Sequence, residues 1–271
     1  MPELPEVETT VRGLVPVLAG ERIARLVVMR EGLRRPFPQD LVQRMVGARV
    51  TALSRRAKYG LIATDRDDVM IFHLGMSGRW RIDADVLEKH DHLRLLTGAG
   101  RWLALNDPRR FGSVDLVSGD AETNFAPFVT LGPEPLSDAF DAAALARALK
   151  GRAAPIKQLL LDQRIVAGLG NIYVCEALFI AGIAPMRAGR DVPRVKLKRL
   201  VVAIKAVLTA AIAAGGSSLR DFVHPNGQLG YFSHAWRVYG REAQACGACT
   251  TPIARLVQGA RSTFYCPRCQ K

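Results

Sequence analysis

Four cysteines near the end of the sequence have a spacing suited to metal coordination. Cys246 and Cys249 are separated by two residues, as are Cys266 and Cys269, and sixteen residues lie between the pairs. This pattern is typical of a ribbon in which four thiolates bind one structural Zn²⁺ and leave no open coordination position. Two redox-active pairs are a weaker interpretation, because neither pair follows a βαβ pattern. The residues between the pairs predict a hairpin with Arg261 near its tip.

The opening stretch MPELPEVETT could carry a nucleophile. Removal of Met1 would leave Pro2 with a free secondary amine, which can condense with an aldehyde or an anomeric carbon to give an iminium ion. The pKa of an α-amine is about 7.7–8.0, so a sizeable fraction is unprotonated near neutral pH. Glu3 could transfer protons as general acid and base. The alternative is that these acidic residues only cap a helix whose first turn contains Pro5.

A glycine-rich turn between two apolar helical segments could bind phosphate. In LLLDQRIVAGLGNIYVCEALF, Gly168 and Gly170 precede Asn171, which is suited to cap the second helix. Free backbone N–H groups at such a helix start bind phosphate, and Lys157 could reach the same region. A purely structural corner between two helices is the alternative.

The charge balance favours phosphate binding. The chain has 38 Lys and Arg against 25 Asp and Glu, a net charge of +13 and a pI of about 10.1. The basic residues cluster in SRRAKYG, DPRRFG, RVKLKRL and QGARSTFYCPRC, which indicates a nucleic-acid partner rather than a generally basic surface. No apolar stretch is long enough for a membrane helix and no secretion signal is evident, so we expect a cytoplasmic protein.

The remaining patterns predict an α+β multidomain protein. Residues 1–20 predict a short extended lead into a helix that Gly20 closes, with a kink or an early end expected at Pro16. Seven short alternating runs between residues 21 and 117 predict a β-sandwich or barrel, and apolar helical patterns follow from residue 137 to about 216. The predicted divisions are a β-domain at 1–125, a linker at 126–136, a helical domain at 137–235 and a zinc finger at 236–271.

Six motifs together resemble the formamidopyrimidine-DNA glycosylase family, the bacterial 8-oxoguanine DNA glycosylases also called MutM. They are MPELPEVET, RRAKYG, HLGMSG, DPRRFG, GLGNIY and RSTFYCPRCQK, and they follow the family's order along the whole chain. The resemblance implies an N-terminal β-sandwich with a leading helix, a helical domain with a helix–two-turn–helix, and a zinc-ribbon hairpin. It also implies a monomer that acts on duplex DNA containing damaged purines, with one structural Zn²⁺ and no organic cofactor.

The same resemblance implies a bifunctional glycosylase and AP lyase that flips the damaged base out of the duplex. Pro2 would attack the sugar C1′ and form a Schiff base, and β- and δ-elimination would then cut the strand. Glu3 would transfer protons, Glu6 would help to organise the site, and Lys58 in RRAKYG would reach the damaged nucleotide. Arg261 is implied as a further catalytic-site residue that grips phosphate.

Other residues are implied to bind DNA around the lesion. Lys157, Asn171, His92 and Arg110 match positions that bind DNA. Met76, Arg109 and Phe111 would fill the space left by the extruded base. A flexible thioether can pack into an irregular space, a guanidinium can hydrogen-bond the partner base, and an aromatic ring can wedge between base steps. The loop at 218–231 corresponds to the segment that closes over the oxidised purine.

Three alternatives have distinct signatures. An endonuclease VIII-like glycosylase for oxidised pyrimidines would share Pro2 and Glu3 but differ from PELPEVE in its opening segment. A non-enzymatic zinc-ribbon DNA-binding protein would keep the basic clusters and use the N-terminus only for folding. A zinc-dependent hydrolase is disfavoured, because the sequence has no His, Asp and Glu cluster that resembles an open metal site.

Overall fold

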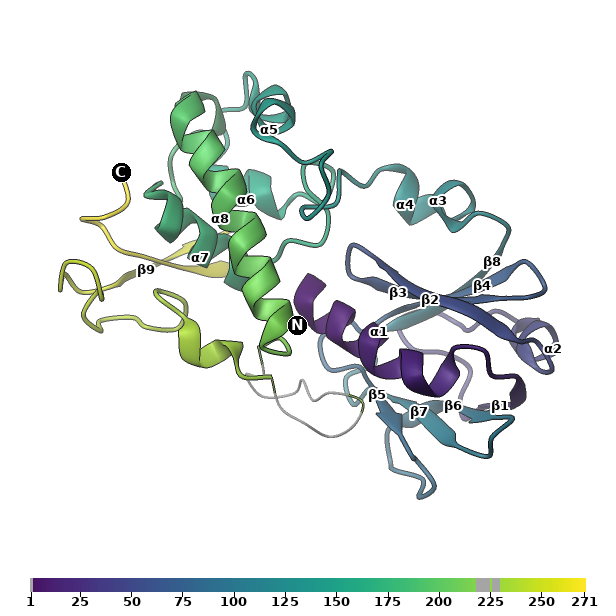
Figure 1. Cartoon of the computed structure of the whole chain (residues 1–271). Coiled ribbons are helices and arrows are strands. Elements are labelled where there is room, and N and C mark those ends of the chain that lie inside the picture. The colour runs from purple at the N-terminus through teal and green to yellow at the C-terminus, as the bar shows by residue number, and fades with distance from the viewer. Residues whose placement is uncertain (1, 218–224, 226–229) are drawn as a thin grey trace. The chain divides into compact units, whose positions relative to one another are not determined.

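The computed structural model describes residues 2–217, 225 and 230–271, which form two compact units (Figure 1). Unit 1 comprises residues 1–130 and 214–233, and unit 2 comprises residues 131–213 and 234–271. Most of the loop expected to close over the damaged purine lies outside the described residues. The four domain limits inferred from the sequence stay predictions.

Unit 1 contains two antiparallel sheets, which confirms the predicted N-terminal β-sandwich. The sheet orders are β1-β6-β7-β5 and β2-β3-β4-β8. The strands are β1 (Ile23–Val28), β2 (Val50–Arg56), β3 (Tyr59–Thr64), β4 (Asp68–His73), β5 (Arg79–Ile82), β6 (Asp91–Thr97), β7 (Trp102–Asn106) and β8 (Ser113–Ser118). The sequence patterns did not predict β5, because it has only four residues and two of them are arginines; its buried Trp80 anchors it in the core.

The two sheets share one hydrophobic core. Phe72 of β4 and Trp80 of β5 belong to different sheets, and their rings meet edge to face with centroids 5.6 Å apart. Helix α1 (Leu4–Leu18) contacts β2, β3 and β5 and adds Val7, Leu14 and Leu18 to the same core. The helical spacing of these apolar residues is therefore explained by burial against both sheets.

Helix α1 continues through Pro16, so the expected early end there is wrong. The helix ends at Leu18, and the backbone N–H of Ala19 still bonds to the carbonyl of Val15. A proline in the last turn removes one helical hydrogen bond. Because Pro16 lies on the exposed side, water can satisfy the carbonyl that would have been its partner.

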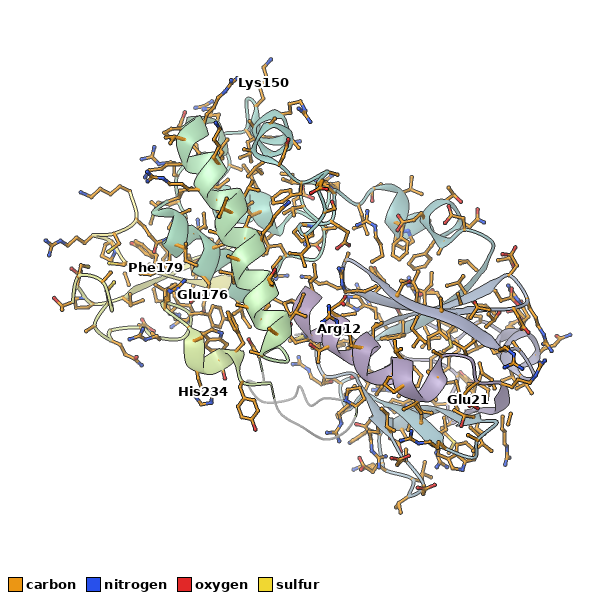
Figure 2. All side chains as sticks on the ribbon, in the orientation of Figure 1. Arg12, Glu21, Lys150, Glu176, Phe179 and His234 are labelled. Atoms are coloured by element: carbon orange, nitrogen blue, oxygen red, sulfur yellow. The ribbon has the colours of Figure 1, made fainter. Side chains whose placement is uncertain are left out.

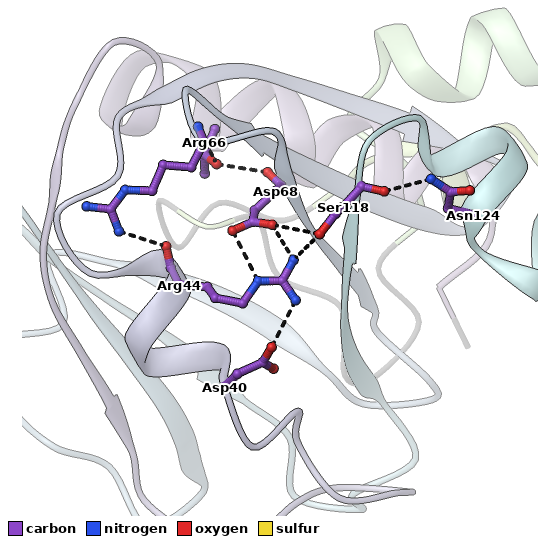
Figure 3. A network of polar contacts seen from close by, with 7 residues as sticks. Asp40, Arg44, Arg66, Asp68, Ser118 and Asn124 are labelled. Carbon is purple, nitrogen blue, oxygen red and sulfur yellow. Dashed lines mark hydrogen bonds and ion pairs between the residues drawn. The ribbon is translucent and has the colours of Figure 1, made fainter.

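A polar network fastens helix α2 (Leu41–Met45) to the edge of the second sheet (Figure 3). Arg44 binds both carboxylate oxygens of Asp68, the Asp40 carboxylate at 2.9 Å and the Ser118 hydroxyl at 2.6 Å. Ser118 in turn donates to Asp68 and accepts from Asn124 through its carbonyl, which ties in the short helix α3 (Ala121–Asn124). The hydrogen bond from Arg44 holds the pKa of Asp68 below its usual range.

Unit 2 is helical and ends in a two-stranded hairpin, as the resemblance implied. Its helices are α5 (Ala142–Leu149), α6 (Ile156–Leu161), α7 (Asn171–Ala181) and α8 (Arg194–Ala213), with a 3-10 helix at Gly189–Asp191. The hairpin strands are β9 (Ala254–Gln258) and β10 (Arg261–Tyr265). Gly259 and Ala260 between them both have positive φ angles, as a tight hairpin turn requires.

The predicted linker at residues 126–136 is not purely irregular, because the short helix α4 (Ala126–Val129) lies within it.

Among the described residues, no helix combines the length and the hydropathy that crossing a bilayer would require.

The Arg44 network gives a prediction for stability against pH. Replacing Asp68 with Asn should lower the free energy of unfolding by about 1–2 kcal/mol near pH 7, because the ion pair is lost. The lowered pKa of Asp68 means that its contribution is present above about pH 4 and is lost as the pH falls through its folded-state pKa. Urea unfolding at about pH 7 and about pH 3 should therefore show the difference shrinking in acid. The Asp40→Asn variant is the control; an equal loss there would contradict the central role of Asp68.

Candidate functional site

The start of α1 places Pro2 and Glu3 in a buried, hydrogen-bonded setting. Glu3 is the N-cap residue, and its backbone N–H donates to Glu6 Oε2 at 2.8 Å in a reciprocal capping box. Glu6 Oε1 also accepts from the backbone N–H of Ser217 at 2.8 Å. Gly216 has a φ of +79°, and a Cβ there would lie 3.0 Å from this carboxylate. The Glu6 carboxylate therefore holds the backbone of Glu3 at the start of α1 and the backbone of Ser217.

Lys58 lies in the turn between β2 and β3, and Arg55 connects this turn to α1. Arg55 donates to the Ala57 carbonyl at 3.0 Å and to Glu8 of α1 at 2.9 Å. Burial raises the pKa of Glu8, but hydrogen bonds from Arg12 and Arg55 outweigh it and leave the pKa below its usual value. Arg55 therefore links the first turns of α1 to the turn that carries the largely buried Lys58.

Two loops that carry the predicted void-filling residues are organised by one buried carboxylate. Asp107 accepts from the Ser77 hydroxyl at 2.6 Å and from the backbone N–H of Gly112 at 2.9 Å. The Ser77 oxygen also accepts from the backbone N–H of Arg109 at 3.1 Å. Met76 precedes Ser77, so this arrangement brings the loop of Met76 beside the loop of Arg109.

The exposed ends of these loops suit contact with another molecule. Phe111 and Arg109 are both exposed, and the guanidinium carbon lies 4.9 Å from the centre of the Phe111 ring. Met76 is partly exposed, and Gly75 before it approaches the Phe111 backbone so closely that a Cβ would lie 2.3 Å away. The structure brings Met76, Arg109 and Phe111 onto adjoining loops.

Two histidines, His73 at the end of β4 and His92 on β6, support these loops from strands of the two different sheets. His92 is buried, and its Nε2–H donates to the Asp107 carbonyl at 3.0 Å. His73, which the sequence did not single out, accepts at Nδ1 from the backbone N–H of Gly75 at 3.0 Å. Burial, followed by the charge of Lys58, lowers the pKa of His73 to about 4. Arg110 is exposed in a left-handed conformation and forms the tip of its loop.

In unit 2, three predicted DNA-binding residues converge on the zinc hairpin. Lys157 is completely buried and donates to the Ser262 carbonyl at 3.2 Å and to the Thr263 hydroxyl at 2.6 Å. Asn171 donates to the same Ser262 carbonyl at 2.9 Å. Arg261 precedes Ser262 and is exposed at the first position of β10. Lys157 and Asn171 therefore position the strand that presents Arg261.

Asn171 is the first residue of α7 rather than its cap, which corrects the sequence-based assignment. The N-cap is Gly170, whose extended backbone a residue of any type could adopt, and no side chain caps the helix. Gly168 before it has a φ of +77°, which favours glycine. The Oδ1 atom of Asn171 is buried and accepts no hydrogen bond from the described residues.

Glu176 on α7, labelled in Figure 2, is a positioning residue that the sequence did not reveal. Its buried carboxylate accepts from the backbone N–H groups of residues 237–239 at 2.8–2.9 Å. Tyr239 packs edge to face on Phe264 of β10 and lies 3.4 Å from the Asn171 amide nitrogen. The sequence marks this role only by a charged residue, Glu176, within an otherwise apolar helical pattern.

The four cysteines form the zinc site that their spacing predicts. Their Sγ atoms all lie within 4.8 Å of one another, and two of the pairs are 3.4 and 4.0 Å apart. A tetrahedral site with Zn–S distances of about 2.3 Å places its sulfurs about 3.8 Å apart. The cluster therefore fits one structural Zn²⁺ with four thiolate ligands, Cys246, Cys249, Cys266 and Cys269.

Loss of zinc should loosen the hairpin and leave unit 1 folded. The Cys249→Ser variant should lose most of its zinc, because a four-thiolate site contributes its binding free energy directly to folding. Metal analysis and amide hydrogen exchange of residues 254–265 would measure both effects. Cys175→Ala is the control for zinc content, since Cys175 is not one of the four ligands although it packs in the same hydrophobic cluster as Cys246 and Cys266. Full zinc content with a protected hairpin in Cys249→Ser would rule out the proposed ligand set.

Comparison with protein-family models divides the chain in the same order. Residues 1–114 match the formamidopyrimidine-DNA glycosylase N-terminal domain, residues 131–223 match the H2TH domain of that enzyme, and residues 243–271 match the zinc finger found in FPG and IleRS. The formamidopyrimidine-DNA glycosylases of Sphingopyxis alaskensis and Rhizorhabdus wittichii are 67% and 64% identical to this chain over 271 residues, with full coverage of both partners.

Solved structures agree over the whole length. The MutM (Fpg) protein from Thermus thermophilus is 39% identical, with a TM-score of 0.89 and coverage of 99% of this chain and 98% of that one. Lactococcus lactis Fpg, in a complex with DNA containing an abasic site, is 33% identical, with a TM-score of 0.91 and full coverage of both chains. The chain therefore belongs to the formamidopyrimidine-DNA glycosylase family, whose members are DNA glycosylases with AP lyase activity.

Proposed function

We propose that this protein excises oxidised purines, formamidopyrimidines and 8-oxoguanine among them, from duplex DNA and then cleaves the abasic strand. The observation that carries the proposal is the pairing of Pro2 with Glu3 at the buried start of α1. Support for the substrate class comes from the related Lactococcus lactis enzyme, solved in complex with DNA containing Fapy-dG. We further propose that it works as a monomer in the cytoplasm.

The proposed chemistry begins at the Pro2 nitrogen. The nitrogen bonds to C1′ of the flipped nucleotide while the N-glycosidic bond breaks and the base leaves with a proton. Opening of the sugar gives an iminium ion, and loss of a C2′ proton expels the 3′ phosphate. A second elimination expels the 5′ phosphate. Glu3 is the proposed carrier of these protons, and the Glu6 carboxylate fixes its backbone N–H.

The other proposed roles follow from which side chains remain accessible. Arg261 is exposed and is the proposed phosphate contact, whereas Lys157 and Asn171 act on DNA mainly by fixing the Ser262 backbone beside it. Lys58 is the proposed contact to the damaged nucleotide from the turn after β2. Its position depends on Arg55, which joins that turn to α1.

We propose that Met76, Arg109 and Phe111 fill the space left by the flipped base, with Arg110 contacting the backbone beside them. Asp107 is then the positioning residue for all of them, since its carboxylate joins the two loops. His92 assists through the Asp107 carbonyl rather than through direct contact with DNA.

Borohydride trapping tests the nucleophile. The Pro2→Gly and Glu3→Gln variants should each lower the yield of covalent adduct with lesion DNA by about 100-fold, within the range of a positioned acid–base group. Both should still bind an abasic-site analogue, because Arg261 and the zinc hairpin are unchanged. Mass spectrometry of the wild-type protein should find Met1 removed. Wild-type levels of trapping by Pro2→Gly would exclude the proline ring nitrogen as the required nucleophile, and a wild-type protein that gives no adduct would belong to the class of non-enzymatic DNA-binding proteins. A panel of oxidised purine and pyrimidine duplexes would separate the substrate proposal from an endonuclease VIII-like one.

A second experiment tests Asp107. In Asp107→Asn, an amide N–H₂ that faces the Gly112 N–H is repulsive, and one that faces Ser77 leaves the Ser77 hydroxyl proton without its carboxylate acceptor, so one of the two loop contacts is lost or weakened. Excision of the lesion base from duplex DNA should slow by about tenfold, in line with misplacement of substrate-positioning groups. Cleavage of a single-stranded abasic oligonucleotide, which needs no void filled, should change by less than about twofold. Equal losses on both substrates would mean that the Pro2 site itself is damaged.

A further inference from the structure

A cavity of about 680 Å³ lies wholly within unit 2, and none of the candidate-site residues described above lines it, although Arg194 and Lys198 belong to the basic segment RVKLKRL. It is formed by α5, the 3-10 helix Gly189–Asp191 and the start of α8, and Figure 1 shows α5 beside the first turns of α8. Part of its wall is apolar, from Ala142, Ala146, Leu149 and Leu197. This volume is in the range of small-molecule binding sites.

The rest of the cavity wall is strongly basic. Five cationic side chains line it: Arg147, Lys150, Arg190, Arg194 and Lys198. Among the described residues only Arg190 has an acidic neighbour, Asp191 at 3.7 Å, and both of those side chains are more than half exposed. Figure 2 shows Lys150 just beyond α5, extending into solvent. A concave surface with charges of one sign concentrates anions.

The start of α8 adds to this positive field. The first residues of this 20-residue helix include Arg194 and Lys198, and its first turn has no acidic residue. Cations at a helix N-terminus oppose the helix dipole, whereas anions are favoured there by the dipole and the free N–H groups. Arg147 has a separate explanation, because it lies in the last turn of α5, where a cation is favourable. Lys196 on α8 donates to the carbonyl oxygens of Gly182 and Lys271, whereas Arg194 and Lys198 have no ion-pair partner among the described residues.

We propose that this cavity binds a small phosphorylated ligand of the nucleotide class, with its phosphates on the cations and its ring on the apolar wall. Two or more phosphates would supply the negative charge that the site lacks. An apolar ring accounts for the alanine and leucine side chains, which a bare anion would not use. The residues proposed to hold DNA in unit 2 lie on α6, α7 and β10, so the cavity is a separate site.

Calorimetry on the full-length, zinc-loaded protein without DNA tests the proposal, with ATP and inorganic tripolyphosphate as probes. Lys198→Glu should weaken ATP binding by about tenfold or more, as expected for loss of a charge-assisted contact to phosphate. Arg199→Glu is the matched control: it makes the same charge change at the next, exposed residue of α8, which does not line the cavity. Its effect should be below about twofold. Ala146→Trp, which fills the cavity without changing the charge, should also block ATP.

Several results would overturn the proposal. Equal weakening by Lys198→Glu and Arg199→Glu would mean that ATP senses only the general surface charge. A loss of long-duplex DNA binding in Lys198→Glu but not in Arg199→Glu would make the cavity part of the DNA footprint. Tripolyphosphate binding as tightly as ATP would remove the role of the apolar wall. Undiminished ATP binding by Ala146→Trp would place the ligand elsewhere.

Discussion

The buried carboxylate of Glu6 determines whether the N-terminus can take part in chemistry. The first residues of a chain usually fray, and a mobile amine cannot be held against a sugar carbon. Glu6 counters this by accepting from the backbone of Glu3 on one side and of Ser217 on the other. A buried carboxylate is costly without such donors, so the start of α1 and the segment of Ser217 favour one arrangement. The apolar face of α1 then fixes this arrangement against both sheets of unit 1.

Buried carboxylates also hold loops in position elsewhere in each unit. Asp107 in unit 1 and Glu176 in unit 2 are both buried, and each accepts hydrogen bonds from backbone N–H groups of a distant or irregular segment. A carboxylate surrounded by backbone donors specifies position more strictly than apolar contacts do, because hydrogen bonds depend on direction as well as distance. Arg109, an exposed side chain proposed to contact DNA, lies in a loop organised in this way, whereas the strand that carries Arg261 is held by donors from Lys157 and Asn171.

This also explains what the sequence could and could not predict. The strands and long helices were recognisable because burial on one face leaves a periodic pattern, and the zinc ligands because metal geometry fixes cysteine spacing. Strand β5 was too short and too charged to leave such a pattern. Glu176 was not recognised because its partners are backbone N–H groups, which have no residue-type signature, and Asp107 was not recognised because its partners are one backbone N–H and a serine thirty residues earlier in the chain. Lys157 was assigned to DNA from the family resemblance, and only the structure reveals its bonds to the hairpin.

The hydrogen bonds that hold the hairpin lie within the protein, so the proposed phosphate contact of Arg261 is positioned before DNA binds. A segment this short cannot bury an adequate core, so zinc supplies the closure at one end. At the other end, the buried ammonium of Lys157 requires acceptors, and Ser262 and Thr263 of β10 provide them. Asn171 donates to the same Ser262 carbonyl. Because these bonds are satisfied within the protein, β10 gains little further order on binding, and the exposed Arg261 can meet a phosphate with little loss of backbone entropy.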